Sequence, residues 1–205
     1  MEETKKTIET RLAVLRSEIE ANEKMFHEMI KAYDGAIYPV DLLAIAVLHR
    51  SQALIEGFCK MVEDRNFDCA APLIRLQLDN CLRFYASFIV KDPHGFAMEV
   101  IGGKHIRKLK DRDGINMTDA HLVEKLSNEK SEYSFIKRLY EDTSGFIHLS
   151  DRHIKKSLGS DIKGERKIAF PLNVKNLKLP ETIFLQAISA FTSATKVLSI
   201  DLLRN

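Results

Sequence analysis

The sequence has no tryptophan and few of the residues that break or cross-link a chain. Its 205 residues include five prolines, nine glycines and three cysteines. So few helix breakers favour long helices. The cysteines (Cys59, Cys69 and Cys81) lack the close paired spacing of a structural zinc site. We expect them to be reduced thiols in the core of a cytoplasmic protein.

Long apolar runs and common catalytic motifs are also missing. The longest apolar run, LLAIAVL at residues 42–48, is far too short to span a bilayer, so no membrane association is predicted. No apolar stretch follows the first six residues, MEETKK, which predicts no signal peptide. The sequence contains no HExxH pair, no glycine-rich phosphate loop and no nucleophile elbow. We therefore expect no metal ion and no cofactor.

Charge is nearly balanced overall but unevenly placed. The formal net charge is +2, yet residues 146–180 hold eight Lys or Arg against three Asp or Glu, a local charge of +5. The first 145 residues therefore carry a net charge of −3. A basic segment on an acidic body favours a polyanionic partner such as RNA or a nucleotide, and a solvated loop is the alternative interpretation.

Hydrophobic periodicity predicts an all-α helical bundle that begins with a long amphipathic helix over residues 1–34. Apolar residues from Ile8 to Tyr33 alternate steps of four and three, with one polar break at Asn22. Such a heptad seam packs inside a bundle or pairs with a second chain. A homodimer, or another homo-oligomer formed through this helix, is therefore one expectation.

Residues 39–205 are predicted to form the bundle itself, so the chain is a single globular domain overall. Apolar helices near 39–65 and 69–90, joined by a short turn, predict a central antiparallel hairpin. The basic stretch KHIRKLKDRDG, residues 104–114, is predicted to be a frayed helix or a loop. Near 160–178 the pattern predicts a short irregular or β-hairpin insertion, and Pro171 would limit any strand to an edge.

The predicted third helix carries a charged ridge. Arg75, Asp79 and Arg83 are four residues apart and share one helix face, flanked by apolar positions. A charge next to buried surface needs a partner. The ridge is therefore either an internal Arg75–Asp79 ion pair that orients the helix, or a site for an anionic ligand.

A second polar ridge has the same spacing later in the chain. Tyr140, Ser144 and His148 lie along one face of a predicted helix over residues 131–147 and its end. A histidine beside a serine and a tyrosine, facing an arginine of another helix, can transfer protons near neutral pH. The alternative is a hydrogen-bonded histidine that closes a helix end, where the helix dipole favours it.

These motifs resemble a family of uncharacterised bacterial helical proteins. The resemblance rests on Arg50-Ser51, a turn with Asn66, the pattern A-x-x-L-x-R-x-x-x-D over residues 70–79, and Y-x-x-x-S-x-x-x-H over residues 140–148. More loosely, the chain is similar to the HEPN class of helical bundles found in toxin and antiviral systems. Many members of that class are metal-independent ribonucleases with an arginine and a histidine a few residues apart on one helix. This chain departs from that motif.

The resemblance implies a metal-independent ribonuclease or toxin-type effector in defence or stress response. His148 would then move the proton, and Arg75 and Arg83 would hold the phosphate. Asp79 would orient Arg75. The predicted catalytic residues are Arg75, Asp79 and His148, and the predicted substrate-binding residues are Arg83, Tyr140, Ser144 and Arg152. The alternative is a non-catalytic, dimerising helical module that binds a protein or a small anionic ligand. The choice depends on whether Arg75 and His148 are close in space.

Overall fold

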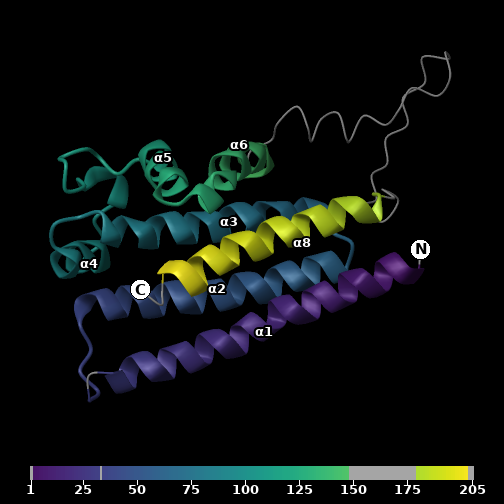
Figure 1. The fold of residues 1–205 in the computed structure, drawn as a ribbon, viewed down its shortest axis with the longest axis horizontal. Coiled ribbons are helices and arrows are strands. Elements are labelled where there is room, and N and C mark those ends of the chain that lie inside the picture. Colours follow the sequence, from purple (N-terminus) through teal and green to yellow (C-terminus); the bar gives the residue numbers. More distant parts are fainter. Residues whose placement is uncertain (1, 33, 148–178, 203–205) are drawn as a thin grey trace, which may run out of the picture.

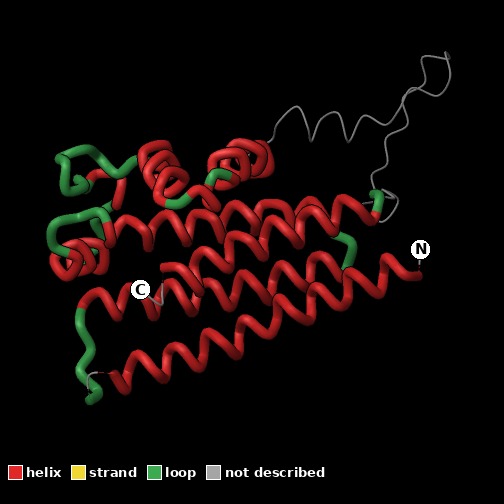
Figure 2. The backbone as a smooth tube through the Cα atoms, in the orientation of Figure 1, coloured by secondary structure: helices red, strands yellow, loops and turns green. Residues whose placement is uncertain are grey.

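Helices make up about four fifths of the described chain (Figure 1). The structure, a computed structural model, describes residues 2–32, 34–147 and 179–202. Its α-helices are α1 (Glu2–Ala32), α2 (Pro39–Glu63), α3 (Phe67–Tyr85), α4 (Pro93–Ile101), α5 (Asp119–Glu129), α6 (Phe135–Ile147) and α8 (Glu181–Lys196). A π-helical turn (Val197–Leu202) continues α8, and short 3-10 turns lie at Ala86–Phe88, Ile106–Lys108 and Ser131–Tyr133. These residues include no β-strand (Figure 2), which confirms the predicted all-α class.

Helix α3 is central. It contacts α2, α5, α6 and α8. The long helices α1, α2, α3 and α8 run alongside one another (Figure 1). The short helices α5 and α6 pack on α3, whereas α4 packs on α2. One face of α3 therefore meets long helices, and another meets α5 and α6.

Local signals set both the start of α2 and its junction with α3. At the start of α2, the Asp41 carboxylate accepts a hydrogen bond of 2.8 Å from the Tyr38 backbone N–H. After α2 ends, Arg65 adopts a left-handed φ of 59°, which turns the chain. Asn66 then caps α3, because its side chain accepts from the Cys69 backbone N–H at 3.3 Å. The two helices lie side by side across this short turn (Figure 1).

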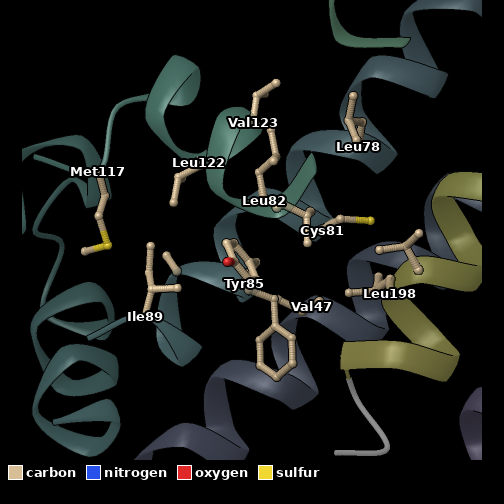
Figure 3. Close-up of a cluster of buried hydrophobic side chains, with 14 of the residues drawn as sticks. Val47, Leu78, Cys81, Leu82, Tyr85, Ile89, Met117, Leu122, Val123 and Leu198 are labelled. Carbon is tan, nitrogen blue, oxygen red and sulfur yellow. The ribbon is translucent and has the colours of Figure 1, made fainter. Parts of the chain in front are cut away.

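One half of the core lies where α3 meets the short helices, the first half of α2 and the π-helical turn after α8. Leu122 and Leu126 of α5, and Met117 before it, have no exposed surface. Figure 3 labels ten members of this cluster: Val47, Leu78, Cys81, Leu82, Tyr85, Ile89, Met117, Leu122, Val123 and Leu198. Fully burying such a side chain contributes about 1.5–3 kcal/mol. The cluster therefore holds α5 and the loop before it against α3.

The other half of the core lies among α1, α2, α3 and α8. Phe58 of α2 stacks on Phe191 of α8 with ring centroids 4.2 Å apart, and both rings are fully buried. Gln77 of α3 donates hydrogen bonds to Ser51 Oγ at 2.7 Å and to Thr195 Oγ1 at 3.1 Å. Because buried polar groups need such partners, these bonds fix the relative register of α2, α3 and α8.

The heptad seam of α1 is buried within its own chain. Ile8, Leu12, Leu15 and Asn22 are at most 5% exposed, and α1 packs on α2 and α8. At these positions the seam packs inside the bundle. The homo-oligomer stays a prediction, and a dimer would have to use another face of α1, such as the one that bears the exposed Val14.

The cysteines divide into two kinds. Cys59 and Cys81 are buried, and burial raises the pKa of the Cys59 thiol to about 11. Cys69 is exposed, so the prediction of a core thiol is wrong there. The reason is its place in the first turn of α3, where Ala70 and Ala71 take the buried face.

Helix α2 is long and apolar enough, by length and composition, to cross a membrane. Half of that apolar stretch is buried inside the bundle. The central helix of a packed bundle has the same properties, because several neighbours cover it.

Three predictions lie outside the described residues. They concern His148, Arg152 and the insertion near 160–178. The site is therefore built from the residues before position 148 and after position 178.

Candidate functional site

The two predicted polar ridges meet at Arg75. Helix α6 packs on α3, and Arg75 Nη1 donates a hydrogen bond of 3.2 Å to the backbone carbonyl of Tyr140. The guanidinium carbon lies 3.4 Å from the centroid of the Tyr140 ring. Ser144 Oγ lies 3.4 Å from the same Nη1. The structure thus brings together three of the predicted site residues from two helices.

The guanidinium of Arg75 is enclosed by these contacts. Arg75 is 8% exposed, its flat face rests on an aromatic ring, and its edge meets a carbonyl. That carbonyl also accepts a hydrogen bond of 2.7 Å from Ser144 Oγ. A planar cation that stacks and donates in this way joins two helices firmly. Arg75 is therefore placed as a clamp between α3 and α6.

Asp79 pairs with other arginines. Its carboxylate accepts from Arg83 Nε at 3.1 Å and lies 3.4 Å from Arg50 Nη1. The nearest carboxylate to Arg75 is Asp119, at 3.9 Å. The predicted Arg75–Asp79 pair is not formed, because Tyr140 holds Arg75 toward α6 while Asp79 meets the arginine one turn further along α3.

Asp119 is a site residue that sequence reasoning missed. It lies in the first turn of α5 and forms an ion pair with Arg83 as well as with Arg75. The preceding Thr118 supplies the helix cap, since its hydroxyl accepts from the His121 backbone N–H at 3.3 Å. A carboxylate next to a threonine cap remains available for other partners, and this was the signal present in the sequence.

The resulting network runs along α3 and keeps a positive charge. It contains three arginines and two aspartates: Arg50, Arg75, Arg83, Asp79 and Asp119. Its net charge is therefore +1. At one end lies the enclosed Arg75, and at the other end lies Arg83, which is about a quarter exposed.

Arg83 opens onto a basic cavity of about 360 Å³. The cavity is lined by Arg83, Val100, Gly103, Lys104, His105, Ile106 and Arg107. No carboxylate lines it. Lys104 pairs with Glu99 at 2.8 Å, whereas Arg107 has no ion-pair partner among the described residues. We call this the basic cavity.

The cavity beside the Arg75 end has a different character. It has a volume of about 420 Å³, lies between α5 and α6, and is lined in part by Tyr140. Its charged groups are Glu124, Glu141 and Lys137, so carboxylates outnumber amines. Such a lining repels a phosphate. The geometry therefore favours an anion at the Arg83 end of the network and disfavours one beside Arg75.

No protein-family model, curated protein or solved structure matches the chain. The resemblance to HEPN-like bundles thus stays a prediction. Within residues 2–32, 34–147 and 179–202, no group of three His, Cys, Asp or Glu side chains is placed to hold a metal ion. The features of the described residues that bear on function are the charged network and its cavities.

Proposed function

We propose that this chain is a helical module that binds a phosphate-bearing ligand in the basic cavity. The observation that carries the proposal is the cavity lining: two arginines, a lysine and a histidine converge, and no Asp or Glu is among the lining residues. Guanidinium groups donate paired hydrogen bonds that match phosphate oxygens. Lysine adds a compact charge.

The charged network prepares Arg83 for this role. Asp79 and Asp119 both hold its guanidinium, which fixes the side chain before a ligand arrives. The negative charges of these two aspartates offset part of the attraction of Arg83 for an anion. Arg107 therefore supplies much of the excess positive charge in the cavity. Across the network and the cavity rim there are five cations and three carboxylates, counting Lys104 and its partner Glu99, which leaves a net charge of +2.

The loop that carries the cavity is anchored. Leu109, just after the 3-10 turn, is buried, and its carbonyl accepts a hydrogen bond of 2.9 Å from the Met117 N–H. Gly103 has a φ of 91°, a left-handed backbone that favours glycine and reverses the chain after α4. The basic side chains therefore project from a loop whose base is fixed in the core.

The phosphate could belong to an RNA chain or to a free nucleotide. The shared chemistry is the phosphate group, and the exposed Lys108 and Lys110 would extend the surface along a polymer. The proposed location is the cytoplasm, where both ligands occur and where the buried thiols remain reduced.

Replacing Arg107 with alanine is expected to weaken pyrophosphate binding at least tenfold in isothermal titration calorimetry. A hydrogen bond to a charged group contributes about 1.5–3 kcal/mol, and tenfold in affinity corresponds to about 1.4 kcal/mol. Arg107 is exposed, so the melting temperature should not change. The matched control is Arg138→Ala, on α6, whose side chain is 88% exposed and should leave binding intact.

A fluorescein-labelled oligoribonucleotide distinguishes the two sources of phosphate. If RNA is the ligand, its affinity falls steeply with salt, and Arg107→Ala reduces the slope of log K against log salt by about one. If a nucleotide is the ligand, pyrophosphate binds and the oligoribonucleotide gains nothing over it. The proposal is wrong if neither probe binds, or if both bind Arg107→Ala as tightly as the unaltered protein.

RNA cleavage without a metal ion is the second candidate function. It is favoured by the contact of Arg75 with Ser144, one helical turn before His148 in the sequence. The enclosure of Arg75 counts against a role in holding phosphate. The same oligoribonucleotide tests this second function. Cleavage in the presence of EDTA that disappears in His148→Ala would support a ribonuclease. If the RNA stays intact, only the binding function remains.

A further inference from the structure

A second cavity lies between α1 and α2, apart from the charged network. Its volume is about 350 Å³, and it is lined by Asn22, Glu23, Phe26, His27, Ile45, Leu48, His49 and Gln52. His49 lines this cavity, whereas its neighbour Arg50 pairs with Asp79 of α3. Helix α2 thus separates this cavity from the charged network, so a ligand bound here would not touch the proposed phosphate site.

Asn22 is the unusual residue of this cavity. It is 1% exposed, and neither its Nδ2 nor its Oδ1 has a hydrogen-bond partner in the described part of the chain. An unpaired buried amide destabilises a fold, and such groups in native proteins call for an explanation. Ile8, Leu12 and Leu15 show that apolar side chains suit the same seam. Asn22 therefore destabilises the packing of α1, and no hydrogen bond within the described residues offsets this cost.

A ligand in this cavity would account for the unpaired amide of Asn22. Asn22 lines the cavity, and its amide atoms, which have almost no exposed surface, lack a partner. A molecule that enters the cavity and turns this side chain toward itself would supply the missing hydrogen bonds. Small-molecule sites commonly combine apolar walls with a few polar groups that fix orientation. Phe26, Ile45 and Leu48 supply such walls here.

We propose that this cavity binds a purine base or a similar flat heteroaromatic ring. A carboxamide presents one donor and one acceptor side by side, which matches the paired acceptor and donor on an adenine edge. Phe26 and His27 both line the cavity, so aromatic rings are present against which a flat base can stack. The cavity volume is near the lower limit of small-molecule sites, which suits a single ring system.

The test uses 2-aminopurine and the full chain. The sequence has no tryptophan, so the fluorescence of this base can be excited with little protein background. Stacking should quench its fluorescence in the unaltered protein. In Asn22→Leu the affinity should fall at least tenfold, while the melting temperature rises by about 3 °C because an unpaired buried amide is removed. Val14→Leu, on the exposed face of the same helix, should change neither quantity.

A second variant guards against overfilling of the seam. Asn22→Ala adds no volume and should lose the base equally. The proposal is overturned if 2-aminopurine is not quenched by the unaltered protein, or if either Asn22 variant binds it as tightly. A fall in the melting temperature of both variants would also overturn it, because the amide would then already be satisfied within the fold.

Discussion

Replacing Arg75 with alanine is expected to lower the free energy of unfolding by about 3 kcal/mol. The side chain is nearly buried, stacks on the Tyr140 ring and donates to the Tyr140 carbonyl. A partly desolvated cation–π contact contributes about 1–2 kcal/mol and a charged hydrogen bond about 1.5–3 kcal/mol, and the two overlap here. Urea denaturation followed by circular dichroism measures the change as a shift in midpoint.

Two further variants separate the possible causes of this effect. Arg75→Lys keeps the charge but loses the flat, forked donor, so we expect an intermediate loss of stability. Arg138→Ala removes an arginine that is almost fully exposed on α6 and should change stability by less than about 0.5 kcal/mol. If Arg75→Ala were as stable as Arg138→Ala, Arg75 would not be the clamp between α3 and α6.

Replacing Asp111 with alanine is expected to destabilise the protein by about 3 kcal/mol at neutral pH. The Asp111 side chain is 1% exposed. One oxygen accepts hydrogen bonds from the backbone N–H groups of Asp113 at 3.0 Å and Ile115 at 2.9 Å, and the other lies 2.7 Å from His121 Nε2. Alanine leaves those donors without an acceptor, and each hydrogen bond to a charged group contributes about 1.5–3 kcal/mol, not additively. The loop that follows the basic cavity depends on this residue.

This contribution of Asp111 should depend on pH in a definite direction. Burial tends to raise the pKa of the Asp111 carboxyl, but the hydrogen bonds from Ile115, His121 and Asp113 outweigh it and hold the pKa below its ordinary value. A carboxyl with a lowered pKa stabilises the fold above its unfolded pKa of about 3.9, and that stability is lost as the pH falls through the folded pKa. The stability gap between the unaltered protein and Asp111→Ala should therefore be full above about pH 5 and shrink below about pH 4.

The neighbouring aspartate provides the control for this titration. The Asp113 side chain is 55% exposed and pairs with Lys125 at 3.2 Å. Asp113→Ala should cost less than about 0.5 kcal/mol. A gap for Asp111→Ala that is absent at pH 7, or that widens toward pH 2, would contradict the role given to the buried carboxylate.

Much of the fold could be predicted because the sequence marks where several helices begin and end. The heptad pattern predicts a helix to about residue 33, and α1 ends at Ala32. Pro39 and Asn66 mark the starts of α2 and α3 through ordinary capping chemistry. The predicted third helix ran too far, to about residue 90. Helix α3 ends at Tyr85 and is followed by a 3-10 turn. The predicted helix is too long because apolar residues that are buried, such as Ala86 and Ile89, continue past the end of the α-helix.

The site was less predictable because it depends on tertiary contacts. The four-residue spacing predicted that Arg75 and Tyr140 each belong to a polar ridge on its own helix. The packing of α6 on α3, which the sequence does not reveal, places the Arg75 guanidinium over the Tyr140 ring. Asp119 lies at the start of a helix, and nothing in the sequence indicates that it pairs with Arg83 of another helix. The cavity residues Lys104, His105 and Arg107 follow α4 in a loop without periodicity, so the sequence described them only as a basic stretch.

We propose that the charged network is structural at Arg75 and that an anion binds at Arg83 and Arg107. Nuclear magnetic resonance of the ¹⁵N-labelled full chain, titrated with pyrophosphate, tests it most directly. We predict shifts in the backbone amides of residues 103–109 and in the Arg83 side chain, with Tyr140 and Ser144 unchanged. Shifts centred on Tyr140 and Ser144, with residues 103–109 unmoved, would contradict the account and return the ligand to Arg75.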